Sequence, residues 1–172
     1  MLNVGLLGCG RIGQVHAKSL GATPRARLVA VADAQPPAAA ALAAATGAAV
    51  RDVDAILAAP DIDAVVIGTP TDTHFDQIHA AAATGKAVFC EKPVDMSTDR
   101  IRACIAAVEA AGIPFMTGFN RRFDPNFAAL QARIAAGEIG EIEIVTLLSR
   151  DPSPPPLDYI ARSGGIFRDM MI

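Results

Sequence analysis

The sequence is poor in aromatic residues, cysteine and charge. Tryptophan is absent and there is a single tyrosine, which argues against the aromatic stacking surface typical of single-stranded nucleic-acid binders. Three cysteines, Cys9, Cys90 and Cys104, form no C-x-x-C pair, so the sequence predicts a reduced cytoplasmic setting and neither a disulfide framework nor a zinc site. Charged residues make up 19% of the chain and the net charge is -3. Without a lysine and arginine cluster, neither a nucleic acid nor a membrane is an expected partner.

Long apolar runs are also missing, and the N-terminal residues show neither the basic segment nor the small-residue cleavage site that is typical of a signal peptide. The longest uncharged stretch, residues 34–50, is mostly alanine and contains two prolines, so it is too weakly apolar to span a bilayer. The sequence is instead rich in alanine, which supplies 35 of its 172 residues and favours helices. The length suits one domain, or one domain and the start of another.

Short β-branched runs alternate with alanine-rich helical stretches up to about residue 120. Strands are predicted at residues 3–7, 27–32, 64–68, 87–90 and 114–117, and helices at 11–20, 37–45, 75–84 and 98–111. Ser97 is the predicted N-cap of the last helix, and Gly112 lies just past its end. Because most of these strands are apolar on both faces, the pattern predicts an α/β fold with a parallel sheet covered on both sides.

The pattern changes after residue 120. Residues 127–136 are predicted to be helical, and residues 141–148 alternate in polarity as a half-exposed strand does. Residues 151–156 (DPSPPP) form a stiff connector, and residues 163–172 are predicted to open a helix. One strand and the opening of a helix cannot form a core alone. We therefore expect the second domain to be incomplete.

The strongest motif is the hexapeptide Gly8-Cys9-Gly10-Arg11-Ile12-Gly13. It follows a predicted strand and opens a helix, which is the context required for dinucleotide binding. Gly8 permits the tight turn, Gly10 lets the backbone approach a pyrophosphate, and Gly13 lets the helix pack on the strand. The helix N-terminus is then free to hold the anion. The alternative is a glycine-rich turn in an unrelated α/β protein.

Asp33 ends the second predicted strand, twenty positions past Gly13. A carboxylate at this place accepts hydrogen bonds from the adenine ribose hydroxyls and repels a 2′-phosphate. The next residues, Ala34 and Gln35, offer no arginine that would hold such a phosphate. The spacing therefore predicts NAD rather than NADP, with a solvated strand-end carboxylate as the alternative.

Two polar segments follow predicted strands, residues 68–74 (GTPTDTH) and 90–93 (CEKP). Open α/β sheets bind ligands at the carboxyl ends of their strands. From spacing alone, however, a capped polar turn and a surface Glu-Lys pair explain these segments equally well. His16 and His79 are predicted to be ordinary helix residues.

Five strings in this order, GCGRIG, TPTDTH, CEKP, GFNRRFDPNF and SGGIFRDM, resemble the Gfo/Idh/MocA oxidoreductases over the whole chain. The resemblance implies an NAD-binding Rossmann domain at residues 1–120, followed at residues 121–172 by the start of a substrate and oligomerisation domain. It also implies oxidation of a cyclic polyol, with myo-inositol as the first choice, and a homo-oligomer for the full-length protein. Alternatives are a related sugar dehydrogenase or reductase, and a non-catalytic NAD-binding regulator.

The resemblance also assigns roles to single residues. Lys92 is implied to be catalytic, its charge stabilising the developing alkoxide, and its bond to Pro93 is often cis in the family. Asp169 is the second implied catalytic residue, in a D-x-x-x-H helix whose histidine is the general base. That histidine would fall at position 173, so we expect negligible polyol dehydrogenase activity from these 172 residues.

Further implied residues line the cofactor and the substrate. Asn120 and Arg122 are implied to contact the substrate together with Lys92 and Asp169. A domain-linking salt bridge is the alternative for either arginine, Arg121 or Arg122. The expected cofactor-binding residues are Gly8, Gly10, Arg11, Ile12, Gly13, Asp33, Thr69, Pro70, Thr71, His74, Glu91 and Lys92.

Overall fold

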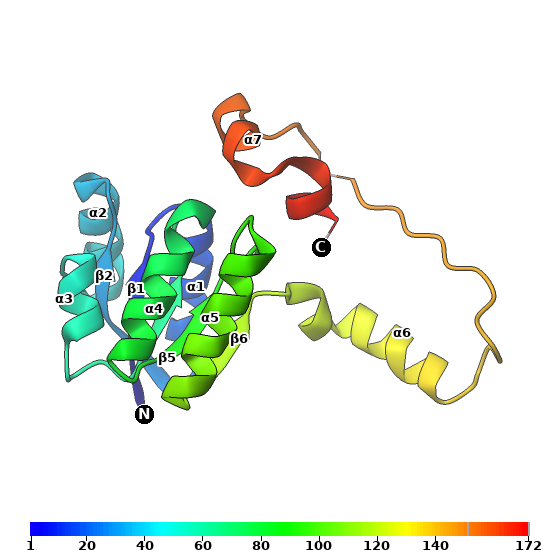
Figure 1. Cartoon of the computed structure of the whole chain (residues 1–172), viewed down its shortest axis with the longest axis horizontal. Coiled ribbons are helices and arrows are strands. Elements are labelled where there is room, and N and C mark those ends of the chain that lie inside the picture. The colour runs from blue at the N-terminus through cyan, green and yellow to red at the C-terminus, as the bar shows by residue number, and fades with distance from the viewer. Residues whose placement is uncertain (151, 172) are drawn as a thin grey trace.

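The computed structural model describes residues 1–150 and 152–171 of the chain. Six parallel strands form one sheet, with helices on both of its faces (Figure 1). The strands are β1 (Leu2–Leu7), β2 (Ala26–Ala32), β3 (Ala49–Val50), β4 (Ala64–Ile67), β5 (Ala87–Cys90) and β6 (Phe115–Thr117). The helices are α1 (Arg11–Gly21), α2 (Pro36–Thr46), α3 (Val53–Ala58), α4 (His74–Ala83), α5 (Thr98–Ala111), α6 (Pro125–Ala135) and α7 (Leu157–Ser163). Shorter turns are the 3-10 helices Thr71–Thr73 and Asn120–Phe123 and the π-helical turn Ile166–Met170.

The strand order β3-β2-β1-β4-β5-β6 places β1 in the middle of the sheet. From β1 the chain runs outward through β2 to β3, and it then crosses back to start again at β4. Because β1 and β4 are parallel neighbours, their carboxyl ends meet at one edge, where Leu7 pairs with Ile67. Ligands of open α/β sheets bind where the strand order reverses in this way. The loops after β1 and β4 are therefore the first place to look for a site.

Two apolar layers, one on each face of the sheet, hold the helices against it. Leu6 and Leu7 are consecutive in β1 and both are fully buried, because successive side chains of a strand point to opposite faces. Leu7 packs in one cluster with Ile56 of α3 and Ile78 of α4, and Leu6 packs in the other with residues of α1 and α2. Burying each leucine contributes about 1.5–3 kcal/mol. Among the described residues, no helix combines the length and apolarity needed to cross a membrane.

The predicted fold class is confirmed as a doubly wound parallel α/β sheet of the Rossmann type. The strands and helices predicted up to residue 117 all form, each within one residue of its predicted bounds. The sequence analysis misses β3 and α3, which have two and six residues and are too short to display a period. The chain after β6 leaves the sheet (Figure 1), and a domain division at residues 120 and 121 stays a prediction.

The prediction of a strand at residues 141–148 is wrong. This segment is irregular, and the described part of the chain contains no strand beyond β6 with which it pairs. Its apolar side chains are open to solvent, with Ile144 at 86% and Leu147 at 84% exposure. Alternating polarity indicates that a segment suits a sheet, but a strand also requires a neighbour to pair its backbone N–H and C=O groups.

An aspartate contributes to the N-termini of two helices, α6 and α5. Asp124 Oδ1 accepts hydrogen bonds from the backbone N–H groups of Asn126 and Phe127, so α6 begins two residues earlier than predicted. Ser97 does occupy the N-cap position of α5, but its hydroxyl makes no capping hydrogen bond. Its backbone N–H instead donates to Asp95 Oδ1 at 2.8 Å.

The helix predicted to open at Ser163 ends there instead. Residues Leu157–Ser163 form α7, which stops at the left-handed Gly164 (φ +79°). The chain then turns into the π-helical segment Ile166–Met170. Residues 151 and 172, at the start of the predicted connector and the end of the predicted helix, lie outside the described residues.

Candidate active site

The glycine loop after β1 contains two positions that only glycine fits and one that is open. Gly8 has a φ of +95°, and a Cβ there would lie 2.6 Å from the carbonyl oxygen of Gly68 after β4. A Cβ at Gly13 would collide with the carbonyl oxygen of Gly8, whereas nothing lies within 4 Å of the Cβ position of Gly10. Gly10 is the N-cap of α1 and no side chain caps that helix. Arg11 and Ile12 form its first turn, whose backbone N–H groups have no acceptor within the helix and suit an anion such as a pyrophosphate.

Asp33 fixes this loop to the end of β2. Its Oδ2 accepts a hydrogen bond from the Cys9 backbone N–H at 2.6 Å, and its Oδ1 accepts one from the Gln35 backbone N–H at 2.7 Å. Each carboxylate oxygen keeps a further lone pair for a ligand hydroxyl. The sequence predicts the ribose contact but misses this second, structural function of the same carboxylate.

The Cys9 thiol lies under the glycine loop and is almost fully buried. Burial, and then the negative charge of Asp33, raise the pKa of Cys9 to about 11. The thiol is therefore neutral near pH 7 and adds no negative charge where an anion would bind.

His74 joins the two polar loops that follow β4 and β5. Its side chain is 1% exposed, with Nδ1 at 2.9 Å from the Pro93 carbonyl oxygen and Nε2 at 2.9 Å from the Thr69 carbonyl oxygen. Carbonyl oxygens only accept, so both contacts are hydrogen bonds at once only when both ring nitrogens carry protons. The buried ring faces the backbone of these loops, and the bond between Lys92 and Pro93 is cis.

The Thr69 hydroxyl donates to Gln77 Oε1 at 2.8 Å and accepts a hydrogen bond from the Thr73 hydroxyl at 2.7 Å. These bonds hold the loop against the start of α4. Pro70 and Thr71 lie in the same loop, which follows β4 at the edge where the glycine loop follows β1. The structure thus brings the predicted cofactor residues of both loops to one edge of the sheet.

Glu91 is paired with His16 of α1, a contact that the sequence analysis misses. His16 Nε2 lies 2.7 Å from Glu91 Oε1, and the Lys92 backbone N–H lies 3.3 Å from Glu91 Oε2. The His16 ring also meets Phe89 edge to face, with 5.0 Å between ring centroids. A Cβ at Gly118 would lie 3.1 Å from Glu91 Oε2. Glu91 thus connects α1 to the end of β5 and to the backbone of Lys92.

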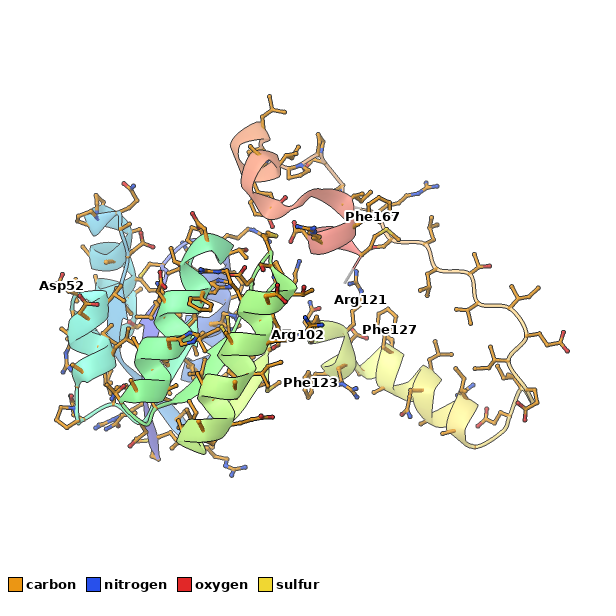
Figure 2. All side chains as sticks on the ribbon, viewed as in Figure 1. Asp52, Arg102, Arg121, Phe123, Phe127 and Phe167 are labelled. Atoms are coloured by element: carbon orange, nitrogen blue, oxygen red, sulfur yellow. The ribbon has the colours of Figure 1, made fainter. Side chains whose placement is uncertain are left out.

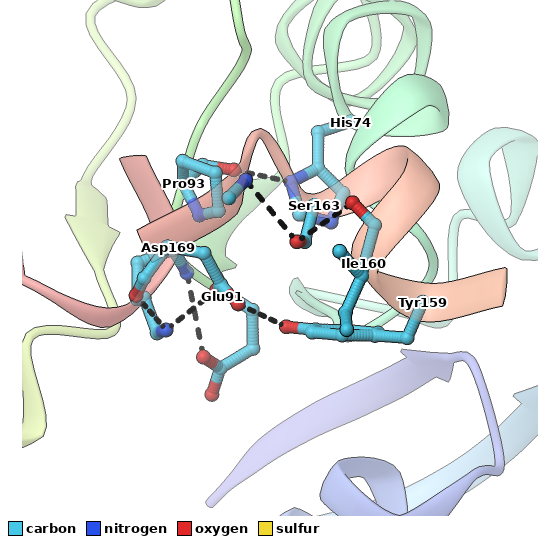
Figure 3. Close-up of polar contacts among 9 residues, drawn as sticks. His74, Glu91, Pro93, Tyr159, Ile160, Ser163 and Asp169 are labelled. Atoms are coloured by element: carbon cyan, nitrogen blue, oxygen red, sulfur yellow. Dashed lines mark hydrogen bonds and ion pairs between the residues drawn. The ribbon is translucent and has the colours of Figure 1, made fainter. Parts of the chain in front are cut away.

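Lys92 and Asp169 form an ion pair between segments 77 residues apart. Lys92 Nζ donates to Asp169 Oδ1 at 2.9 Å and to the Asp169 carbonyl oxygen at 2.7 Å. The Tyr159 hydroxyl donates to Asp169 Oδ2 at 2.7 Å (Figure 3). The Asp169 side chain is 3% exposed and the Lys92 side chain 31%, so Lys92 is the member of the pair that is partly open to solvent.

The predicted substrate residues Asn120 and Arg122 lie in the 3-10 turn after β6 and are exposed. Neither side chain makes a hydrogen bond with another described residue, whereas the neighbouring Arg121 donates to the Ser149 hydroxyl at 3.3 Å. Figure 2 shows Arg121, Phe123 and Phe127 on the segment that leaves the sheet. The structure therefore does not bring Asn120 or Arg122 into the Lys92–Asp169 contact.

The chain is similar to a known family of proteins and to individual members of it. Residues 2–119 match the model of the Gfo/Idh/MocA family, described as an oxidoreductase family with an NAD-binding Rossmann fold. Inositol 2-dehydrogenase of Rhizobium meliloti (strain 1021) is 62% identical over 168 residues, which cover 98% of this chain and 51% of that protein.

Two solved structures extend the comparison. A myo-inositol dehydrogenase from Corynebacterium glutamicum has a TM-score of 0.91 and 48% identity, covering 99% of this chain and 52% of that one. A scyllo-inositol dehydrogenase from Lactobacillus casei, solved with bound NAD(H) and scyllo-inositol, has a TM-score of 0.78 and 30% identity over 82% of this chain and 43% of that one.

The chain spans about half the length of the curated relatives it matches. The family model nevertheless covers the whole parallel sheet, from the first residue of β1 to beyond β6. It includes the glycine loop, Asp33 and Lys92, whose geometry is described above. On this evidence the chain belongs to the Gfo/Idh/MocA family of oxidoreductases, with its NAD-binding Rossmann fold.

Proposed function

We propose that this protein is an NAD-dependent oxidoreductase that oxidises a secondary alcohol of a cyclic polyol, myo-inositol in the first instance. The observation that carries the proposal is the Lys92–Asp169 pair, since it holds a partly exposed lysine just after the carboxyl end of β5, in the same sheet whose β1 leads into the glycine loop. The relatives named as inositol dehydrogenases support the choice of substrate.

The residues at this edge fit NAD. The backbone of the glycine loop leaves open space at Gly10 and ends on the uncapped N-terminus of α1, which suits the pyrophosphate. Asp33 would accept the ribose hydroxyls, and Thr69, Pro70, Thr71 and Glu91 would line the nicotinamide end. His74 would not contact the cofactor directly but would hydrogen bond to the backbone of the loops that contain Thr69 and Pro93. When bound, NAD supplies a nicotinamide C4 that accepts the hydride of the carbinol carbon.

Lys92 would act on the alcohol oxygen. Nζ carries three N–H groups, and Asp169 takes two of them through its carboxylate and its carbonyl. The third remains for the substrate hydroxyl. The hydroxyl proton would pass to a general base, which the family resemblance implies to be the histidine four residues after Asp169. A fixed positive charge at the alcohol oxygen stabilises the negative charge that develops as this proton leaves, and so lowers the barrier to hydride loss.

The test is a turnover assay with a form of the protein as long as its curated relatives. With NAD⁺ and myo-inositol we expect NADH and an inosose ketone, with slower turnover of glucose. NADH from a sugar at a higher kcat/KM than from any inositol would move the substrate to the sugar alternative. Tight NAD binding without oxidation of any polyol or sugar would indicate the non-catalytic alternative and contradict the proposal.

A further inference from the structure

Tyr159 is a residue of the site that no sequence motif marks. It lies on α7, ten residues before Asp169, and its hydroxyl points at the carboxylate (Figure 3). Lys92 holds one oxygen of that carboxylate and Tyr159 the other, at 2.9 Å and 2.7 Å. Two donors on two different oxygens fix the plane of the carboxylate group. A carboxylate held by one donor rotates much more freely about its Cβ–Cγ bond.

The fixed plane decides where the Lys92 ammonium lies. Asp169 is buried, so an oxygen that loses its donor has no solvent to replace it. Without the Tyr159 hydroxyl, the free oxygen would compete for the third N–H of Lys92. That N–H is the one that the proposed function reserves for the substrate hydroxyl. The tyrosine hydroxyl thus keeps Asp169 from taking up all of the donors of Lys92.

Tyr159 and Asp169 lie on the two arms of a helical hairpin, which consists of α7, the turn at Gly164 and the π-helical segment Ile166–Met170. After α7 the chain turns at Gly164, where a Cβ would lie 2.7 Å from Met96 Sδ in the loop after β5. Arg168 Nη1 donates to the Met96 carbonyl oxygen at 3.2 Å, and the Ser163 hydroxyl accepts from the Gly165 N–H at 3.4 Å. The turn at Gly164 and the arm that carries Arg168 therefore both lie against Met96, four residues after Lys92.

Tyr159 is also kept in its donor form. Burial, and then the hydrogen bond to Asp169, raise the pKa of Tyr159 to about 12. Its hydroxyl therefore stays protonated near pH 7 and remains a donor to Asp169.

We propose that Tyr159 is a positioning residue which orients the Asp169 carboxylate and thereby leaves one N–H of Lys92 free for the substrate. The proposal rests on the proposed function. A residue that only stabilised the fold would change the stability of the protein, whereas Tyr159 is proposed to change its turnover, through the orientation of Asp169.

A titration tests the contact without any turnover. The chain has one tyrosine and no tryptophan, so tyrosinate absorbance reports Tyr159 alone. Circular dichroism shows at which pH values the chain is still folded. In the folded chain we expect the Tyr159 phenol to remain largely protonated at pH 10, where free tyrosine is half ionised. In Asp169→Ala it should ionise at a lower pH. The same curve for both proteins would overturn the proposal.

Turnover then tests the positioning, in a form of the protein as long as its relatives. Tyr159→Phe should lower kcat for myo-inositol by about 10- to 100-fold and leave the Kd for NAD unchanged. In an Asp169→Ala background the same substitution should add almost no further loss. Ser163→Ala removes a hydrogen bond from the same hairpin without touching Asp169, so it should lower stability but not kcat.

The outcomes separate the two proposals. Wild-type kcat in Tyr159→Phe, or a full additional loss in the Asp169→Ala background, would overturn the role of Tyr159. If the unsubstituted protein oxidises no polyol, the proposed function fails, and the titration decides the Tyr159 contact by itself.

Discussion

Replacing Lys92 by methionine is expected to lower kcat for polyol oxidation by about 10²–10³-fold. The substitution keeps the apolar stem and removes the ammonium that lies 2.9 Å from Asp169 Oδ1. Since the charge matters most when the alcohol oxygen becomes negative, the loss should fall on kcat, and the Kd for NAD should hardly change. Steady-state rates and calorimetric NAD binding, in a form of the protein as long as its relatives, provide the two measurements.

The control for Lys92→Met must account for the carboxylate that the substitution leaves behind. Asp169 is buried and would lose its positively charged partner. A buried charge without a partner lowers the stability of the folded protein. The double variant Lys92→Met/Asp169→Asn removes that unpaired charge, and we expect it to unfold at a higher temperature than Lys92→Met but to remain as slow. Lys18→Met, on the exposed surface of α1, should behave as the wild type. Near-normal kcat in Lys92→Met would remove this residue from the proposed mechanism.

Replacing Asp33 by alanine is expected to narrow the preference for NAD over NADP. If Asp33 repels the 2′-phosphate and accepts the ribose hydroxyls, the two cofactors should differ by on the order of 1–3 kcal/mol, roughly 5- to 150-fold in Kd, before the substitution. Titration of the 172-residue chain with NADH and NADPH measures this difference directly. Equal Kd values for the two cofactors in the unsubstituted chain would contradict the assignment of Asp33.

The structure shows why Asp33→Ala needs controls of its own. The carboxylate also accepts the N–H of Cys9 at 2.6 Å, so alanine loosens the glycine loop as well as removing the charge. Asp33→Asn retains an acceptor and removes the charge, and we expect it to narrow the preference with a smaller loss of NAD affinity. Asp63 likewise accepts a backbone N–H, that of Asn3 at 2.7 Å, before β4. Asp63→Ala should therefore change neither the Kd for NADH nor the Kd for NADPH, and their ratio should stay the same.

The local features of the fold were predictable because they depend on neighbours in the sequence. A strand buried on both faces, such as β1, is a short apolar run whichever sheet contains it. The spacing of Gly8, Gly10 and Gly13 follows from one turn and one helix start, so six residues are enough to predict this loop. The same reasoning fails for residues 141–148, since local alternation carries no information about a partner strand.

The contacts that build the site were mostly not predictable. His16 meets Glu91 across 75 residues, and Lys92 meets Asp169 across 77. No spacing rule links such pairs, and Lys92 and Asp169 were singled out only through the family resemblance. Tyr159 carried no signal, since its role depends on a contact with Asp169, which the turn after α7 brings back to it.

The most direct test of the proposed function follows the hydride itself. A form of the protein as long as its relatives is incubated with NAD⁺ and myo-inositol that carries deuterium on the ring carbons, and the NADH produced is analysed by mass spectrometry and NMR. Oxidation at a carbinol carbon predicts one deuterium per NADH, located at C4 of the nicotinamide, with its formation abolished or strongly slowed in Lys92→Met. NADH without deuterium at C4, or NADH formed equally fast by Lys92→Met, would contradict the proposed function and the site described for it.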